Sequence, residues 1–279
     1  MGLRDLLVVV DAGKASEARL ELAVSLAAEH AAHLTGLFIL PLPEPSRYES
    51  PDLVDTLIAL CIREEREEAR DARAVFETMV NRYGVAGEWR TGGGFASREA
   101  TLHARYCDLA IVGQAASDLA DQTMPPLQPE ELVLGSGRPV LVTPHSWKPG
   151  KVGRHILLAW NARREAARAA NDALPLLSRA DAVTVVVVNP EPWVLPPHGE
   201  QPGADIALHL ARHSVKSNVL VAEVPGAETG AVLRSKCREL GADLLVMGAY
   251  GHSRTRERVL GGVTRDILAR MEIPVLMSH

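Results

Sequence analysis

Blocks of apolar residues separated by amphipathic stretches run along the whole chain. The apolar blocks are short and nearly continuous in Val, Ile and Leu, which is typical of strands buried on both faces of a parallel sheet. In the first half they lie at residues 6–11, 34–40, 107–113 and 138–145, and a further strand is predicted at 87–91. Between the first two, Leu20, Val24 and Ala27 recur at helical spacing after Ser16, a residue type that caps helices. The pattern predicts strands that alternate with helices.

The same series of blocks occurs twice. The matching segments are 6–11 (LLVVVD) with 156–161 (ILLAWN), 107–113 (CDLAIVG) with 242–248 (ADLLVMG), and 138–145 with 273–279. The offset is 161 − 11 = 150 for the first pair and 248 − 113 = 135 for the second. The second copy is therefore shorter in its middle, where a Pro-rich loop at 190–202 and a short helix at 204–214 replace a long helix predicted at 52–83. A loop rich in turn formers at 144–150 separates the copies, so we expect two domains, residues 1–145 and 153–279.

Each copy reads as five strands with helices between them, since strands at 183–188 and 218–224 complete the second copy, where a helix over 163–177 repeats the first helix. The predicted fold class is α/β, with two tandem doubly wound parallel five-stranded sheets of the Rossmann-like type. Ligands of such sheets bind beyond the carboxyl ends of the strands, where the strand order reverses. These ends carry Asp11 and Asn161 after the first strands, and Gly113 and Gly248 at the fourth.

Composition narrows the function classes. The 30 Lys and Arg residues against 35 Asp and Glu leave a formal charge of −5, which offers no general field for nucleic acid. Cys61, Cys107 and Cys237 form no CxxC pair, which argues against a disulfide scaffold or a zinc knuckle. The apolar run at residues 6–10 is too short for a signal peptide or a membrane span. We therefore expect a cytoplasmic protein without nucleic-acid or membrane partners.

A glycine loop follows the fourth strand of the second copy. Gly248 and Gly251 are separated by two residues, and nine more precede Gly261. Glycines let backbone N–H groups approach an anion, and the helix that begins near Val263 adds further donors and a positive dipole end. Such a loop can cradle phosphates. Equally, Gly248 can simply end a strand and the later glycines form a turn, and the spacing alone leaves both interpretations open.

Together with the repeat, this G-x2-G-x9-G pattern resembles the nucleotide-binding loop of the universal stress protein (UspA-type) family, and the resemblance covers the chain as two tandem domains. It implies an adenine nucleotide α-hydrolase-like fold and ATP as cofactor, with or without Mg²⁺. By this resemblance Gly248, Gly251 and Gly261 contact ribose and phosphates, and Asn161 stands where an Asp contacts adenine. The remaining predicted site residues follow Gly251, and they are His252, Gly262 at the family's Ser/Thr position, Val263 and Thr264. Positive charge nearby comes from Arg254, Arg256, Arg258 and Arg265.

The first copy lacks this loop. At the offset of 135, Gly251 corresponds to Ala116, Gly261 to Pro126 and Gly262 to Leu127, and a proline has no N–H to donate. We expect this copy to keep the fold and Asp11 but not the phosphate loop. The run of glycines at 92–94 is either an anion nest or, as its place before a helix favours, a β-α turn.

Other motifs are weaker. His209 and His213 have the spacing of two ligands to one metal, but no HExxH accompanies them, so a solvated helix face is favoured and no metal is predicted. A P-loop and a GxSxG elbow are both absent from the sequence. Glu257 is the carboxylate within the glycine loop, flanked by arginines.

These observations predict a stress-response regulatory protein that binds ATP in the second domain and is not an enzyme, with very slow ATP hydrolysis at most. The alternatives are a protein-interaction module of the same fold that binds no nucleotide, and an adenylyl-transferring or hydrolytic enzyme of a related fold. We expect an unidentified protein partner and an intramolecular pseudo-dimer through residues 140–143 and 275–278, with a homodimer left open.

Overall fold

The computed structural model describes residues 2–40, 51–115, 126–190, 201–251 and 261–279, with all of their side chains except those of Lys14 and residues 51–65. The chain divides into two compact units, residues 2–138 and 139–279, and each is described by itself below. Within the described residues, no helix is both long and apolar enough to cross a bilayer.

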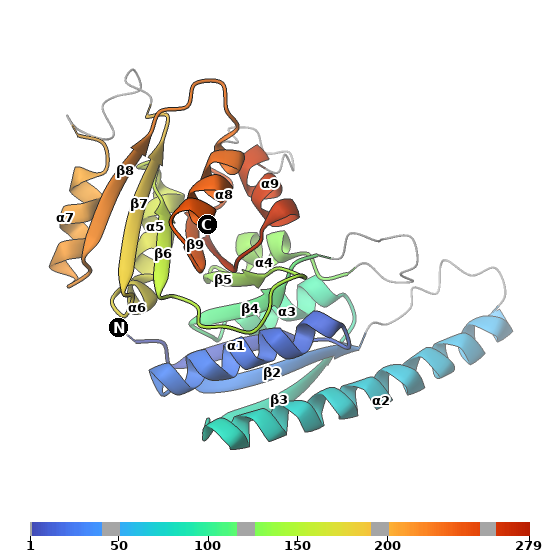
Figure 1. Ribbon diagram of the computed structural model, residues 1–279. Coiled ribbons are helices and arrows are strands. Elements are labelled where there is room, and N and C mark those ends of the chain that lie inside the picture. Colours follow the sequence, from blue (N-terminus) through green and yellow to red (C-terminus); the bar gives the residue numbers. More distant parts are fainter. Residues whose placement is uncertain (1, 41–50, 116–125, 191–200, 252–260) are drawn as a thin grey trace. The chain divides into compact units, whose positions relative to one another are not determined.

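The first unit is a parallel sheet covered by helices (Figure 1). Its strands, in the spatial order β3-β2-β1-β4, are β1 (Asp5–Val10), β2 (His33–Leu40), β3 (Gly87–Gly93) and β4 (Leu109–Gly113). The connecting helices are α1 (Lys14–His30), α2 (Pro51–Tyr83) and α3 (Ala96–Ala104), and α4 (Pro129–Gly135) follows β4. The apolar strands β1, β2 and β4 and the inner helix faces form its core, whereas the edge strand β3 is largely exposed.

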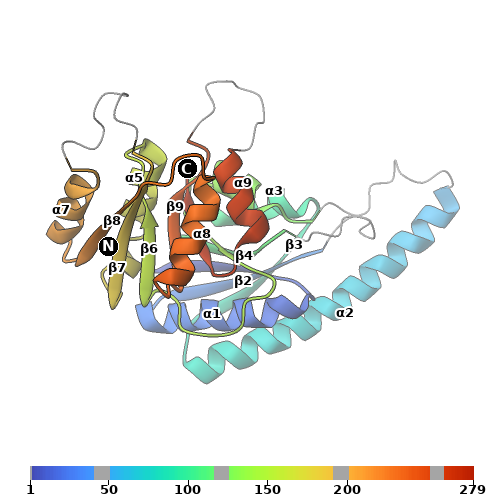
Figure 2. The same ribbon diagram turned by 45° about the horizontal axis from the view of Figure 1, so that its top comes forward.

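The second unit repeats this order and extends it. Its strands, in the order β8-β7-β6-β9-β10-β5, are β5 (Val140–Thr143), β6 (His155–Ala159), β7 (Ala182–Val188), β8 (Ser217–Ala222), β9 (Leu244–Gly248) and β10 (Val275–Ser278). Its helices are α5 (Arg164–Asp172), α6 (Leu174–Leu177), α7 (Ala204–Arg212), α8 (Thr229–Glu239) and α9 (Gly262–Arg270). Helices α8 and α9 pack side by side (Figure 2), and α5 packs against β9 and β10.

The predicted fold class is confirmed, since both units are mostly parallel sheets with alternating helices. Strand β5, which closes the first sequence repeat, is grouped with the second unit, where it pairs antiparallel with β10. Val142 lies opposite Val275, and Val140 lies opposite Met277. The other strand pairs within each unit are parallel.

Two local predictions are wrong. Ser16 does not cap the first helix, because Gly13 is the N-cap of α1 and Ser16 lies buried in the first turn. The chain turns earlier because the Asp11 carboxylate accepts the N–H of Gly13 at 2.8 Å. The helix expected over residues 163–177 is two helices, α5 and α6, since Pro175 in the first turn of α6 removes a backbone donor.

Candidate functional site

The carboxyl ends of β6 and β9 form the switch point of the second sheet. The chain leaves β6 toward β7 on one side and leaves β9 toward β10 on the other, so the two following loops diverge. Open α/β sheets bind ligands in the crevice between such loops. The loop after β6 carries Asn161, and the turn after β9 carries Gly248 and Gly251. The structure therefore brings these three predicted residues to one edge of the sheet.

Asn161 is exposed directly after β6. Its side-chain oxygen accepts the N–H of Arg163 at 3.1 Å, which closes an Asx turn before α5. Ala162, between them, has a left-handed φ of 55°. A carboxamide oxygen has two lone pairs and its nitrogen two hydrogens, so the side chain retains acceptor and donor capacity at the surface.

The glycines after β9 are required by close packing. A Cβ on Gly248 would overlap the backbone of Glu165 and Ala166 at the start of α5. At Gly251 there is little room for a side chain, since an added Cβ would lie 3.3 Å from Glu165 Oε2 and 3.4 Å from Arg163 Cδ. The Gly251 carbonyl accepts a hydrogen bond from Arg163 Nη1 at 2.7 Å. Helix α5 and the glycine turn are thus fixed to each other.

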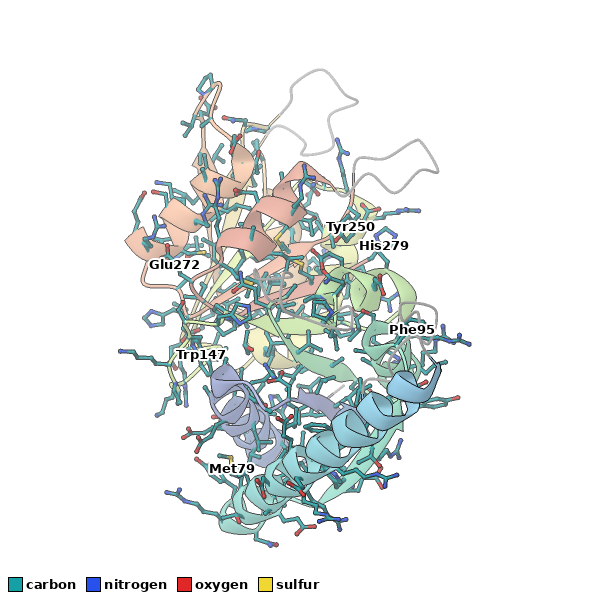
Figure 3. All side chains as sticks on the ribbon, turned by 90° about the vertical axis from the view of Figure 1, so that its right-hand side faces the viewer. Met79, Phe95, Trp147, Tyr250, Glu272 and His279 are labelled. Carbon is teal, nitrogen blue, oxygen red and sulfur yellow. The ribbon has the colours of Figure 1, made fainter. Side chains whose placement is uncertain are left out.

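Thr264 holds the other end of this turn. It is buried, and its hydroxyl accepts the N–H of Tyr250 at 3.3 Å. Tyr250 has a left-handed φ of 63°, and its ring packs edge-on against His279 at 6.3 Å between centroids (Figure 3). Sequence reasoning gave Thr264 a hydroxyl to offer a phosphate; in the structure that hydroxyl positions the turn between Ala249 and Gly251.

Helix α9 begins at two glycines, which carry no side chain. Gly261 is its N-cap and Gly262 its first residue, so the cap contributes no side-chain acceptor. A Cβ on Gly262 would meet nothing within 4 Å, and Gly262 is exposed. The first N–H groups of a helix have no partner within it, and they lie at the positive end of its dipole. Gly262 and Val263 therefore offer backbone donors for an anion.

Glu165 is a site residue that sequence reasoning missed. Its side chain is 7% exposed and lies beside Gly251, with Oε1 2.5 Å from Arg164 Nε. Burial raises the pKa of this carboxyl. The hydrogen bond from Arg164 and the positive charges of Arg164 and His279 oppose burial and outweigh it, so the net pKa is lowered. The first copy has Ala15 at this place (165 − 15 = 150), so no repeated motif marks it. The glycine turn consequently has an ionised carboxylate, paired with Arg164, next to it.

The corresponding place in the first unit is filled by Arg19. This side chain is 2% exposed and donates from Nε to Val9 O at 2.8 Å and from Nη2 to Asp11 Oδ2 at 2.5 Å. Ser16 Oγ accepts a further bond from Nη2 at 3.2 Å. A Cβ on Gly113, the counterpart of Gly248, would overlap Arg19 Nη1. The crevice between β1 and β4 is therefore occupied by the protein's own guanidinium group.

The helix after β4 also differs from α9. Helix α4 has Pro129 in its first turn, and the N–H of its N-cap Gln128 is already bonded to Ser97 Oγ at 2.9 Å. The glycines at 92–94 belong to the end of β3 and the following turn, where Gly94 has a φ of 119° and donates its N–H to Leu40 O at 3.1 Å. This arrangement is a β-α turn rather than an anion nest.

Several predicted residues lie outside the described part of the chain. They are His252, Arg254, Arg256, Glu257, Arg258 and Ala116. Arg265 is described and is exposed on α9. The rings of His209 and His213 stand 4.7 Å apart on α7, and in the described ranges no group of three or more His, Cys, Asp or Glu residues is placed to hold a metal.

Comparison with known proteins adds sequence relationships. Residues 153–279 match the family model described as the Universal stress protein family. A curated universal stress protein from Synechocystis sp. (strain ATCC 27184 / PCC 6803 / Kazusa) is 35% identical over 94 residues, which are 34% of this chain and 30% of the relative. The chain thus spans less than a third of the length of that relative.

Solved structures share the fold over nearly the whole chain. A universal stress protein from Archaeoglobus fulgidus DSM 4304 superimposes with a TM-score of 0.74 at 16% identity, covering 98% of this chain and 95% of the other. A functionally unknown protein from Pseudomonas aeruginosa PAO1 gives 0.61 at 18% identity, covering 99% and 92%. At these identities the likeness concerns the fold alone.

Proposed function

We propose that this chain, whose residues 153–279 match the universal stress protein family model, is a regulatory stress-response protein that binds ATP at the switch point of its second unit. One observation carries the proposal. The glycine turn after β9 and the N-terminus of α9, which carries no side-chain cap, both offer backbone at the crevice where open α/β sheets bind ligands.

The described residues fit a nucleotide in three respects. The N–H groups of Gly262 and Val263 would hold phosphate oxygens, and the side chain of Asn161 would pair with the adenine edge. Backbone at Gly251 would lie against the ribose. A side chain at Gly261 would come within 3.6 Å of Tyr250 Cα, so glycine there keeps the space beside the turn open. Bound ATP supplies the negative charge that these donors match.

The described residues of the first unit offer no equivalent. Arg19 fills its crevice, and Pro129 and the bonded N–H of Gln128 leave α4 with fewer free donors than α9. Calorimetric titration of the full chain with ATP tests the proposal, and we expect a single site per chain. No heat of binding at any ATP concentration would favour the alternative, a protein-interaction module of the same fold that binds no nucleotide.

We expect the bound ATP to be hydrolysed more slowly than about one turnover per minute, far below a typical enzyme rate of ~10 per second. Fast phosphoryl transfer needs a positioned base or water, and the buried carboxylate at the turn, Glu165, is already bonded to Arg164. Steady-state phosphate release with Mg²⁺ or Mn²⁺ measures the rate. Rapid turnover that Glu257→Gln abolishes would instead show an enzyme.

Glu165 should make nucleotide binding depend on a divalent cation. A fixed carboxylate next to Gly251 repels phosphate oxygens unless a cation lies between them. We expect Glu165→Gln to tighten ATP binding at least tenfold in EDTA and to change it little with Mg²⁺ present. Glu239→Gln, an exposed carboxylate paired with Lys236 on α8, is the matched control and should change neither value. Equal cation dependence in wild type and Glu165→Gln would contradict the assignment.

A further inference from the structure

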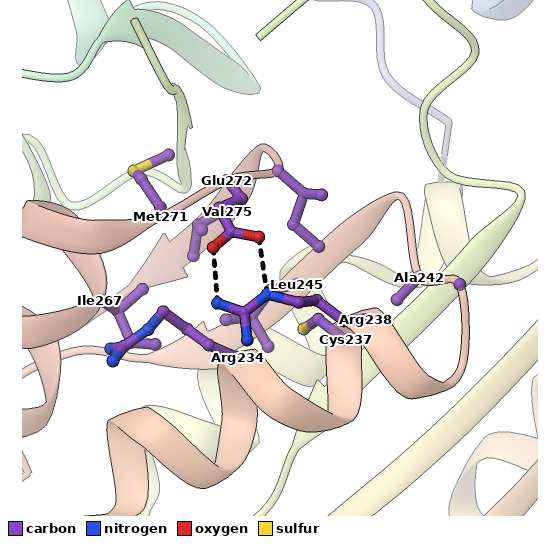
Figure 4. A pocket seen from close by; sticks show the side chains of 11 residues that line it. Arg234, Cys237, Arg238, Ala242, Leu245, Ile267, Met271, Glu272 and Val275 are labelled. Carbon is purple, nitrogen blue, oxygen red and sulfur yellow. Dashed lines mark hydrogen bonds and ion pairs between the residues drawn. The ribbon is translucent and has the colours of Figure 1, made fainter. Parts of the chain in front are cut away.

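A pocket of about 190 Å³ lies at the opposite end of β9 and β10 from the glycine turn. It opens between the last turns of α8 and α9 and reaches the first residues of the two strands (Figure 4). Its walls are mostly apolar, formed by Cys237, Ala242, Leu245, Ile267, Met271, Ile273 and Val275. All of these residues belong to the second unit, so the pocket is complete within it.

The interior of the pocket is chemically inert. Cys237, Leu245 and Ile267 are buried, and they present a thiol and two aliphatic side chains. Burial raises the pKa of the Cys237 thiol to about 12, so the thiol stays neutral and behaves as a soft apolar wall rather than as a nucleophile or metal ligand. The interior therefore suits an uncharged, apolar group.

The mouth of the pocket is charged. Arg238 donates from Nε and Nη2 to the two oxygens of Glu272, at 2.8 and 2.5 Å, and this ion pair spans from α8 to the turn before β10 (Figure 4). Both side chains are more than half exposed, at 59% and 55%, and exposed pairs of this kind contribute little stability. An incoming carboxylate can therefore replace Glu272 on the guanidinium group at small cost.

Positive charge is in excess at this mouth. Arg234 lines the pocket and is paired with Asp266, which also binds Arg270 at 3.1 Å. The residues that line the pocket thus include two guanidinium groups, Arg234 and Arg238, and one carboxylate, Glu272. The charge balance favours an anion, and the planar guanidinium donors favour a carboxylate.

We propose that this pocket is a second ligand site, which binds a small apolar monocarboxylate with its body among Cys237, Leu245 and Ile267 and its carboxylate on Arg238. The size supports a compact ligand, since a cavity of about 150 Å³ holds benzene and this one is somewhat larger. A ring with a short acid side chain fits, whereas a nucleotide does not. The inference does not depend on ATP binding, because the two sites lie at opposite edges of the sheet.

Calorimetry of the full chain with phenylacetate tests the site, with 2-phenylethanol and 2-phenylethylamine as the neutral and cationic isosteres. We expect phenylacetate to bind at least tenfold more tightly than the alcohol, and the amine not at all. Arg238→Gln should lower the affinity for phenylacetate at least fivefold. Glu272→Gln, which removes the competing carboxylate, should raise that affinity. Both residues are exposed, so neither change threatens the fold.

The location is tested by filling the pocket. Ala242→Phe places a ring from the pocket wall into the cavity and should abolish phenylacetate binding, whereas Gly93→Val, in open space on β3 of the first unit, should leave it unchanged. The proposal is overturned if none of the three compounds binds, if the alcohol binds as tightly as the acid and Arg238→Gln changes neither affinity, or if a folded Ala242→Phe variant binds phenylacetate as tightly as the wild type.

Discussion

Gly251→Val should lower the affinity of the chain for ATP at least tenfold, in a protein that otherwise binds one ATP per chain. Gly251 already lies against the α5 N-terminus, with Glu165 Oε2 3.3 Å and Arg163 Cδ 3.4 Å from where its Cβ would be. The branched side chain of valine must therefore project into the crevice or displace the turn that Arg163 holds through the Gly251 carbonyl. Either outcome removes backbone from the position that a nucleotide would use. Gly261→Val should act similarly, because a Cβ there already makes ordinary contact with Tyr250 at 3.6 Å and the two further methyl groups must take up the space beside the turn.

Matched glycine variants separate the site from general effects on the fold. Gly262→Ala adds a methyl group where nothing lies within 4 Å and keeps the backbone donor, so ATP binding should be nearly unchanged. Gly93→Val, at the end of β3 in the first unit, also meets open space and should have no effect. Calorimetry reports affinity and stoichiometry together. Two nucleotides per chain, or wild-type affinity in both Gly251→Val and Gly261→Val, would refute the proposed site.

The order of elements was predictable because it depends on local periodicity. Continuous apolar runs mark the central strands, and comparison of the two copies reinforces their assignment, as with β4 and β9. Details set by single contacts were not predictable. The early start of α1 depends on one bond between Asp11 and Gly13, which outweighs the capping tendency of Ser16.

The glycines of the candidate site could be predicted from the sequence, but its charged side chains could not. Glycine spacing identified Gly248, Gly251 and Gly261, because a chain that must approach other backbone closely or leave its own backbone open uses glycine. Nothing local indicates that Glu165 is folded in beside the turn, or that Arg19 is folded into the crevice of the first unit. Both lie on helices where charged residues usually face solvent, and only the tertiary fold decides their direction.

A fragment of residues 153–279 should self-associate. In the full chain β10 pairs with β9 on one side and antiparallel with β5 on the other, and all four of its residues are buried. The fragment lacks β5, which leaves the second side of β10 with unpaired N–H and C=O groups along an apolar strand. Exposed edges of this kind pair with other chains. A second β10 offers the same antiparallel edge, so a dimer or larger species is the expected product.

A peptide of residues 138–145, which contains β5, should compete with this association by adding a strand to the open edge. Light scattering after size exclusion, at micromolar fragment concentration, should show the fragment shifting toward a monomer with the peptide and not with a scrambled sequence of the same composition. The register predicts which side chains matter, since Leu141 lies opposite Leu276 and Val142 opposite Val275. A peptide with both residues changed to Asp should lose its effect, because buried charges without partners oppose pairing. If the fragment alone stays a stable monomer at high concentration, pairing with β5 is not what satisfies the β10 edge.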